Sequence, residues 1–370
     1  MNIINKTAGF FKRQTVLCIS LAAAIVSMFF IPPDIKYSEY VDFPVIMLLF
    51  CLMGVVAGLR SAGIFEKLTG VLLKFAGTTR TLAFILMNIC FFVSMLVTND
   101  VALLTFVPLT IILYKGSTSN KNCLITIILQ TAAANLGSML TPVGNPQNLY
   151  LYTEYDLSMD FFAKTLLPIG ILSYVLLSLL CLLIKNDKIE LKKSMEKSLQ
   201  YKKLIIMSAL FVICILTVLR FVPHILCLVL VCIGLLTEPK LFIKIDYTLL
   251  FTFVCFFIFV GNIGRIDAVR DFLSDIMNGK ELMVSALVSQ VISNVPAAVM
   301  LSAFTDNAGE LLRGVNIGGL GTPVASLASL ISYQLYAKSD GASKGRYMGM
   351  FLIINAVLLT AIMLIACFVL

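Results

Sequence analysis

Long runs of apolar residues, separated by short polar segments, follow one another along almost the whole chain. Residues 15–31 (TVLCISLAAAIVSMFFI) and 43–59 (FPVIMLLFCLMGVVAGL) are two such runs, and each approaches the roughly 20 residues that an α-helix needs to cross the hydrocarbon core of a bilayer. Continuous apolar runs lack the alternation of a membrane β-barrel, so helices must satisfy the backbone hydrogen bonds. The pattern predicts an all-α polytopic membrane protein. Ile31-Pro32-Pro33-Asp34 lacks a small-residue cleavage pattern, so we expect the first run to be a retained helix.

The composition agrees with this interpretation and narrows the class. Of 370 residues, 59% are hydrophobic and 13% are charged, a balance that soluble globular domains do not show. The ten cysteines lie singly inside apolar runs, without the paired spacing of a metal or redox site. Because the sequence has no nucleophile elbow, phosphate-binding glycine loop or His/Cys ligand pattern, we expect no enzyme and no cofactor other than a coupling ion.

The charged residues predict how the chain crosses the membrane. Basic residues dominate segments 60–80 and 185–203, whereas acidic residues dominate segments 34–42 and 153–160. Because basic loops stay on the cytoplasmic side, we expect a multi-pass protein of the inner (cytoplasmic) membrane with its N-terminus in the cytoplasm and its C-terminus outside. The net charge of +8 then reflects topology, and we expect a lipid bilayer, not a nucleic acid, as partner.

One segment leaves the cytoplasmic side and returns to it. Residues 81–113 follow Arg80 and precede Lys115, and their two arms meet at Thr98-Asn99-Asp100. The second arm, 101–114, rises only about 21 Å, whereas the hydrocarbon core is about 30 Å thick. We therefore expect a re-entrant hairpin here.

The same parts recur in the second half of the chain. A second pair of short arms, 282–292 and 295–304, flanks Ser293-Asn294-Val295. Residues 136–152 (LGSMLTPVGNPQNLYLY) align without a gap on 317–333 (IGGLGTPVASLASLISY), sharing Thr-Pro-Val and the closing tyrosine. Matches in the same order indicate an internal repeat. Counting the crossings gives the two copies opposite orientations in the membrane.

This repeat defines the expected domain organisation. The first inverted repeat spans 1–184, a cytoplasmic loop and linker helix span 185–223, and the second inverted repeat spans 224–370. The whole fold then has about nine transmembrane helices, two re-entrant hairpins and two broken helices. The hairpins are 81–113 and 282–304, and the broken helices are 123–152 and 311–336.

The broken helices indicate what this architecture does. Prolines in Thr141-Pro142-Val143-Gly144-Asn145-Pro146 remove amide donors and prevent a regular helix. Thr322-Pro323-Val324-Ala325-Ser326 interrupts the corresponding run. Inverted repeats with discontinuous helices are typical of carriers that work by alternating access, with the cargo bound near the midplane. We expect the four interrupted elements to converge, with freed carbonyl oxygens suited to a cation.

The candidate binding residues lie at these tips and breaks. Helix N-termini at the tips favour an anion, and neutral oxygens suit Na⁺, so the two together indicate coupled transport. Small polar residues also serve close helix packing, an alternative that their symmetric placement disfavours. The candidate substrate or ion ligands are Thr98, Asn99, Asp100, Thr141, Pro142, Gly144, Asn145, Asn148, Ser293, Asn294, Val295, Thr322, Pro323 and Ser326, and the Na⁺ candidates among them are Thr98, Asn99, Ser293 and Asn294.

Asp100 is the candidate that close helix packing explains least, because a carboxylate at membrane depth costs several kcal/mol unless it is paired, protonated or hydrated. It is suited either to ligate Na⁺ or to carry a proton. It also suits the N-terminal cap of the second hairpin arm. A role in ion or proton binding is compatible with a role as helix cap, and both alternatives stay open.

Four motifs resemble those of the ion transporter superfamily: TNDVALLTFVPLT, TPVGNPQN, GTPVASLAS and SNVPAAVML. This group contains citrate-type and divalent anion permeases, arsenite permeases and one class of Na⁺/H⁺ antiporter. The resemblance spans roughly residues 15–370 and implies an inverted-repeat carrier with sodium sites at hairpin tips and broken helices. Members often work as homodimers by elevator-like motion, so kinship alone suggests a homodimer.

The tips differ from those of the family's dicarboxylate symporters, which carry Ser-Asn-Thr at both. Here Asp100 and Val295 replace the last threonines, which removes two hydroxyls for substrate carboxylates and adds a negative charge. The Asn-Asp pair is instead similar to arsenite permeases, whose cargo is uncharged. We expect a Na⁺- or H⁺-coupled secondary transporter of a small carboxylate or inorganic anion, similar to citrate transporters. Arsenite or antimonite efflux and Na⁺/H⁺ exchange are the alternatives.

Overall fold

The computed structural model describes both predicted hairpins and both predicted broken helices. Lys115, segment 189–198 of the basic loop and the N-terminal residues, on which part of the charge argument rests, lie outside the described residues. The structure describes residues 15–114, 120–188, 199–339 and 341–368.

The described residues form an all-α fold, which confirms the predicted fold class. Their only bridge of β type is isolated and joins Thr78 to Lys188. The α-helices are α2 (Thr15–Phe30), α3 (Tyr37–Tyr40), α4 (Phe43–Ser61), α5 (Ile64–Leu72), α6 (Thr79–Val93), α7 (Asn99–Leu113), α8 (Asn120–Ser138), α9 (Pro146–Glu154), α10 (Met159–Leu180), α11 (Tyr201–Val218), α12 (His224–Leu236), α13 (Tyr247–Ile263), α14 (Asp267–Met277), α15 (Glu281–Ile292), α16 (Asn294–Ser302), α17 (Ala308–Ile317), α18 (Leu327–Ala337) and α19 (Lys344–Phe368). Short 3₁₀ helices are η1 (Leu73–Phe75), η2 (Pro142–Gly144), η3 (Cys181–Leu183) and η4 (Pro239–Lys244).

Several of these helices are long and apolar enough to cross a bilayer. Within the described residues, four pass by length and composition: α4, α11, α19, and α10 together with η3. A fifth results if α13 and α14, which are bent by 104° to each other, count as one span. The chain is therefore an integral, multi-pass membrane protein. The expected total of nine crossings stays a prediction, because α2, α6, α7, α12 and α15 are shorter apolar helices.

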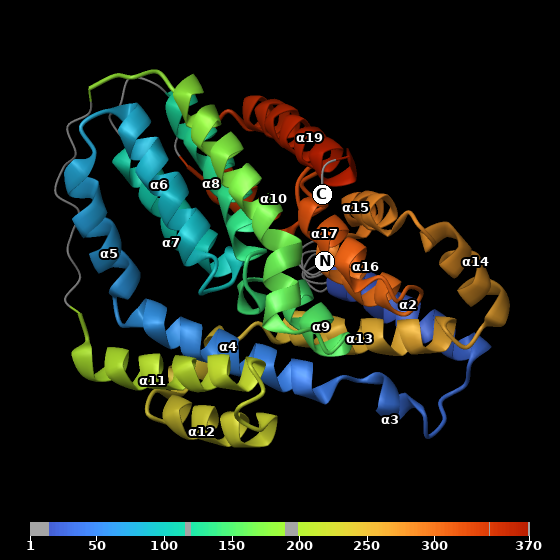
Figure 1. Cartoon of the computed structure of the whole chain (residues 1–370). Helices are drawn as coiled ribbons and strands as arrows, with labels where there is room; N and C mark the ends of the chain where they lie inside the picture. The colour runs from blue at the N-terminus through green and yellow to red at the C-terminus, as the bar shows by residue number, and fades with distance from the viewer. Residues whose placement is uncertain (1–14, 115–119, 189–198, 340, 369–370) are drawn as a thin grey trace, which may run out of the picture.

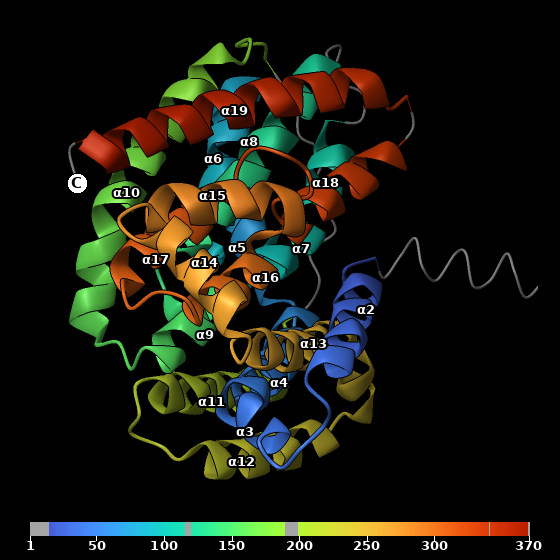
Figure 2. The same cartoon turned by 90° about the vertical axis from the view of Figure 1, so that its right-hand side faces the viewer.

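The helices are arranged in two layers (Figure 1). Helices α4, α11, α12 and α13 lie along the lower side, and the hairpins and broken helices lie above them. The lower helices share a core that includes Leu48, Cys214 and Val231. Helices α6, α7, α8 and α10 share a second core around Phe91 and Phe106. Figure 2 shows α19 passing across the top of the upper layer.

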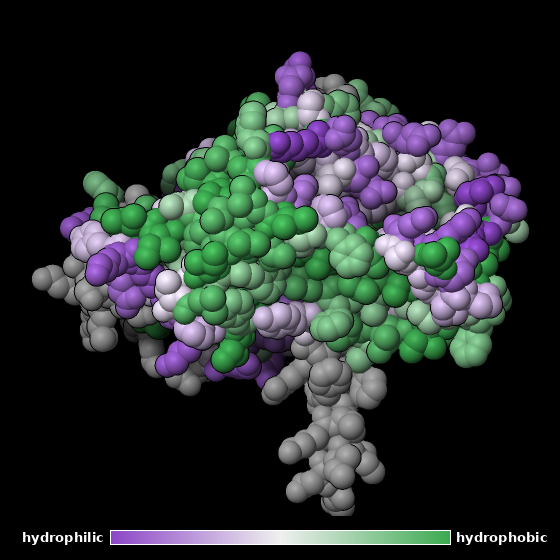
Figure 3. All heavy atoms as spheres, turned by 90° about the horizontal axis from the view of Figure 1, so that it is seen from below, coloured by the Kyte–Doolittle hydropathy of each residue, from purple (hydrophilic) through white to green (hydrophobic). Residues whose placement is uncertain are grey.

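The outer face of the lower layer is apolar. Seen from below, a broad hydrophobic area occupies the middle of this face (Figure 3). Large apolar side chains of α12, among them Ile225, Val229 and Ile233, are exposed. Exposed apolar surface of this extent suits contact with lipid chains and not with water.

Equivalent elements of the two halves pack crosswise. Helix α9 follows the first break and packs against α16 of the second hairpin, while α18 follows the second break and packs against α7 of the first hairpin. In the same way, α2 packs against α13 and α12 packs against α4. This exchange brings both tips and both breaks into one region. The opposite orientation of the two halves in a bilayer stays a prediction.

Candidate functional site

The two hairpin tips have different backbones. In the first, Thr98 precedes α7 in extended backbone, with φ −63° and ψ 149°. In the second, Ser293 alone separates α15 from α16 and has φ 77°, a left-handed conformation that costs about 1–3 kcal/mol for a non-glycine residue. The N–H of Asn294 and the hydroxyl of Ser293 donate to the carbonyl of Ala325, at 3.0 and 3.4 Å. The second break thus holds the strained tip in place.

Each break is fastened to the hairpin of its own half by a threonine. Thr141 Oγ1 donates to the carbonyl of Met95 at 2.5 Å and accepts from the N–H three residues later at 3.1 Å. Thr322 Oγ1 donates to the carbonyl of Gln290 at 3.0 Å and accepts from the N–H three residues later at 3.2 Å. Met95 and Gln290 each precede the tip asparagine by four residues. Both threonine hydroxyls therefore serve the backbone of the breaks.

Two buried asparagines join the halves. Asn135 Oδ1 accepts from Asn99 Nδ2 of the first tip and from Ser326 Oγ of the second break, both at 2.9 Å. Asn316 Nδ2 donates to Asn148 Oδ1 at 2.7 Å. Asn135 and Asn316 immediately precede the two aligned segments, so they occupy equivalent places. Buried amides with partners on both sides fix the relative position of the four interrupted elements.

The shape of the first break depends on Asn148 and Gly144. Asn148 Nδ2 donates to the carbonyls of Met139 and Thr141 at 3.1 and 3.3 Å, which satisfies groups that the interrupted helix leaves unpaired. A Cβ on Gly144 would lie 2.2 Å from the carbonyl oxygen of Ser138. Only glycine permits this approach of two backbone segments.

The tips and breaks together enclose a small cavity of about 10 Å³, which is room for about one water-sized sphere. Apolar contacts come from Pro146, Leu249, Val295 and Leu327. The polar side chains that line it are Asn99 and Asp100 from the first tip, Asn145 and Gln147 from the first break, Asn294 from the second tip and Ser326 from the second break.

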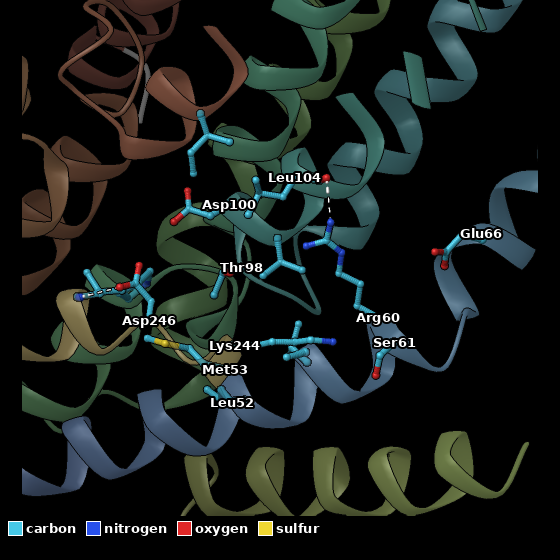
Figure 4. Close-up of a pocket in the computed structure, with 16 residues that line it drawn as sticks. Leu52, Met53, Arg60, Ser61, Glu66, Thr98, Asp100, Leu104, Lys244 and Asp246 are labelled. Atoms are coloured by element: carbon cyan, nitrogen blue, oxygen red, sulfur yellow. Dashed lines mark hydrogen bonds between the residues drawn. The ribbon is translucent and has the colours of Figure 1, made fainter. Parts of the chain in front are cut away.

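A larger cavity of about 670 Å³ adjoins the small one. Asp100, Pro146 and Leu249 line both. Helix α4 supplies one wall and α7 the opposite wall, and in Figure 4 the side chain of Arg60 extends from α4 toward α7. Arg60 Nη2 donates to the carbonyl of Leu104 at 3.0 Å.

The larger cavity holds charges of both signs. Arg60 and Lys244 line it as cations, and Glu66, Asp100 and Asp246 line it as acidic residues. In Figure 4, Asp100 and Asp246 lie at the same end of the cavity, away from Glu66. Positive groups at one part of the wall and two carboxyl groups at another provide places for an anion and for a cation in one chamber.

The structure divides the predicted site residues into two groups. Half of them line at least one of the two cavities: Thr98, Asn99, Asp100, Asn145, Asn294, Val295 and Ser326. The rest hold the backbone around the cavities and belong to neither lining in the described part of the chain: Thr141, Pro142, Gly144, Asn148, Ser293, Thr322 and Pro323.

Several residues of this region were not predicted from the sequence. The paired positions of Asn135 and Asn316 were a usable signal, because both precede the aligned segments. Gln147 has no polar counterpart, because Ala328 stands at the equivalent place in the other half. A search for polar residues repeated in both halves therefore does not find it. Asp246 and Lys244 lie far from both hairpins in the sequence, and only folding places them in the larger cavity.

Comparisons with known proteins match this chain to a family of transporters. The profile of the citrate transporter family matches residues 3–314. An uncharacterized transporter of Methanocaldococcus jannaschii is 31% identical over 348 residues, which are 93% of each chain. The inner membrane protein YbiR of Escherichia coli is 32% identical over 313 residues, 83% of this chain and 84% of YbiR. The silicon efflux transporter LSI3 of Oryza sativa is 28% identical over 205 residues, 52% of this chain and 40% of LSI3.

These matches confirm the resemblance to the ion transporter superfamily that the motifs indicated. The family profile covers most of the chain, including both hairpins and the first break. The chain belongs to the citrate transporter family.

Proposed function

We propose that the protein is a Na⁺- or H⁺-coupled secondary transporter of a small carboxylate or inorganic anion, working by alternating access in the inner membrane. One observation carries the proposal: both hairpin tips and both breaks contribute to one small cavity, which adjoins a chamber large enough for a small-molecule cargo. Discontinuous helices that meet at a shared site are the means by which such carriers bind cargo near the midplane.

The charges of the larger cavity support anion binding. Arg60 and Lys244 offer positive charge to a carboxylate or an oxyanion, and a low dielectric strengthens such pairing. Asp100 and Asp246 then repel a bare anion unless a cation or a proton neutralises them. Neutralisation by the coupling ion makes anion binding depend on that ion, which is the physical basis of symport.

Ligand-dependent stability of the purified full-length protein tests this proposal. Thermal unfolding is measured in Na⁺, K⁺ or choline at several pH values, against citrate, succinate, sulfate, phosphate and arsenite. A ligand at 100 times its Kd stabilises the folded state by about 2.7 kcal/mol. Stabilisation by an anion only with Na⁺, or only at low pH, supports coupled anion transport. Stabilisation by an anion that is the same with and without Na⁺ and at every pH contradicts coupled transport.

A second function is favoured by the acidic end of the cavity. Asp100 and Asp246 do not repel an uncharged oxyacid, and the relative LSI3 is named a silicon efflux transporter. Efflux of arsenite, antimonite or a similar neutral oxyacid is therefore the alternative, with Na⁺/H⁺ exchange as a third. Stabilisation by arsenite without any anion effect supports the oxyacid function. Stabilisation by Na⁺ or protons alone supports exchange.

A further inference from the structure

Two helices, one from each layer, end in the same kind of turn. After α9, the N–H groups of Asp156 and Leu157 donate to carbonyls of the last helical turn at 3.2 and 3.0 Å. After α11, the N–H groups of Arg220 and Phe221 donate in the same way, both at 2.9 Å. This pair of bonds is the Schellman motif, which most often has glycine at its left-handed position. Here that position holds Asp156 in one turn and Arg220 in the other.

The backbone at both positions is unfavourable for a residue with a side chain. Asp156 has φ 51° and Arg220 has φ 67°, a region in which Cβ crowds the following carbonyl oxygen. After α4, Gly63 occupies the corresponding position with φ 86°. Because glycine takes this conformation more easily, the use of Asp156 and Arg220 requires a reason outside the turns themselves.

The two charged residues bind each other. Arg220 Nη1 lies 2.7 Å from Asp156 Oδ1, and Arg220 Nη2 donates to the carbonyl of Leu157 at 3.3 Å. The guanidinium carbon also lies 5.4 Å from the centre of the Tyr152 ring, which allows a cation–π interaction. One side chain of the α11 turn thus contacts three groups of α9 and the turn that follows it.

This contact joins the two layers of the molecule. Helix α11 belongs to the lower layer, and α9 and α10 belong to the upper one (Figure 1). Helix α9 begins at Pro146, which lines both cavities, and ends at the turn that Arg220 holds. Movement of α9 relative to α11 therefore has to break the contact.

The contact lies on the side of the membrane predicted to be opposite Arg60. The charge pattern places segment 153–160 outside and segment 60–80 in the cytoplasm, and Arg60 and Glu66 of the latter line the larger cavity. The side chains of Arg220 and Asp156 are 44% and 86% exposed, so water can replace each partner when the pair separates. Such a contact biases an equilibrium without blocking it.

We propose that Arg220 and Asp156 form a latch on the outer side, which favours the conformation whose larger cavity adjoins the cytoplasmic side. Breaking the latch shifts the equilibrium toward the conformation that opens outward. This inference rests on the alternating access proposed above and adds the contact that biases it.

Thiol labelling without any substrate tests the latch. Val101→Cys, on the wall of the larger cavity, is placed in a background without reactive native cysteines. Right-side-out and inside-out vesicles are treated with a membrane-impermeant methanethiosulfonate, and the ratio of outside to inside labelling rates reports the conformational balance. Asp156→Gly and Arg220→Gly each remove the latch, and each is expected to raise this ratio at least about threefold.

The glycine variants separate the latch from folding. Because glycine fits the backbone of both turns, the midpoint of thermal unfolding is expected to stay close to that of the parent protein. The double variant Asp156→Arg with Arg220→Asp restores opposite charges and is expected to return the ratio toward the parent value. Lys164→Gln is the control, because it breaks a 2.8 Å ion pair with Asp160 within α10 alone; it should leave the ratio unchanged.

The outcomes also distinguish the latch from the proposed cargo. An unchanged ratio in both glycine variants overturns the inference, and so does an equal change in Lys164→Gln, which would assign the effect to outer charge in general. If no anion stabilises the protein but the glycine variants raise the ratio, the latch stands and the proposed cargo does not, because no substrate enters the labelling experiment.

Discussion

At the residue scale, the predicted site residues divide into side chains that line a cavity and side chains that hold the backbone around it. Asn99 does both, because it lines the cavity and donates to Asn135. Thr141 and Thr322 use their hydroxyls to bind backbone groups of the hairpins and the breaks. Substitutions in the two groups should therefore have different consequences, one for binding and the other for stability.

Replacing Asp100 with asparagine tests the coupling role of its carboxyl group. Asp100→Asn keeps the size of the side chain but removes the charge that a cation or a proton neutralises. Flux in proteoliposomes is expected to fall at least about tenfold, and the remaining ligand binding should lose its dependence on Na⁺ or pH. Asp267→Asn is the control, because Asp267 lies on α14 with an exposed side chain. Unchanged cation dependence in Asp100→Asn would contradict the role.

The tip asparagines give a second prediction at this scale. Asn99→Ala and Asn294→Ala should abolish coupled flux while the protein remains folded, because both side chains line the shared cavity. Size-exclusion profiles and thermal unfolding report folding, and isotope uptake reports flux. Normal uptake in both variants would remove the tips from the mechanism.

At the element scale, the breaks exist because prolines stop the helices and specific hydrogen bonds hold the resulting loops. The sequence predicted the positions of both breaks, because Pro and Gly change the backbone conformation locally. It predicted both tips from the short apolar arms that flank them. It did not predict that Thr141 and Thr322 bind backbone carbonyls, because their partners Met95 and Gln290 lie in the hairpins, 46 and 32 residues away in the sequence. Residue type alone does not distinguish a threonine that binds the substrate or ion from a threonine that holds the backbone in place.

Thr141 and Thr322, which bond each break to its hairpin, are expected to contribute to the stability of the folded protein. Thr141→Val and Thr322→Val each remove the hydrogen bond to a hairpin carbonyl, which then has no threonine partner, and one hydrogen bond to an N–H of the break. Each is therefore expected to lower the free energy of unfolding by about 1–3 kcal/mol. Thr252→Val is the matched control, because Thr252 Oγ1 donates only to the Thr248 carbonyl of its own helix in the described contacts. Thermal unfolding measures the effect, and equal loss in all three variants would rule out a special role of the breaks.

Gly144 provides a steric test of the same loop. Gly144→Ala places a Cβ 2.2 Å from the Ser138 carbonyl oxygen, so the break has to open and both stability and binding should fall. Gly345→Ala is the control, because a Cβ there meets nothing within 4 Å. Thermal stabilisation by the best ligand measures both consequences, and wild-type behaviour of Gly144→Ala would show that the loop tolerates the shift.

At the scale of the whole molecule, the crosswise packing of α9 on α16 and of α18 on α7 makes the central region a joint product of both halves. The larger cavity lies between the lower layer, through α4, and the first hairpin, through α7. Alternating access requires this chamber to open to one side of the membrane at a time.

Cysteine labelling tests that requirement. In a background without reactive native cysteines, Val101→Cys places a thiol on the wall of the larger cavity. A charged thiol reagent is expected to reach it from the side of Arg60, predicted to be cytoplasmic, and a bound ligand should protect it. Val229→Cys, on the exposed apolar face of α12, should not react in either condition. Simultaneous, ligand-independent reaction from both sides would indicate a continuous pore.

The sequence by itself determined the membrane-embedded helical class, the positions of both breaks and both tips, and the order of equivalent parts, because apolar runs and prolines act over a few residues. Only the tertiary structure decided which polar groups share a cavity. Asp246 and Asp100 are distant in the sequence, and Gln147 has no counterpart in the other half. Whether a buried amide finds a partner depends on packing between helices, which no local pattern encodes.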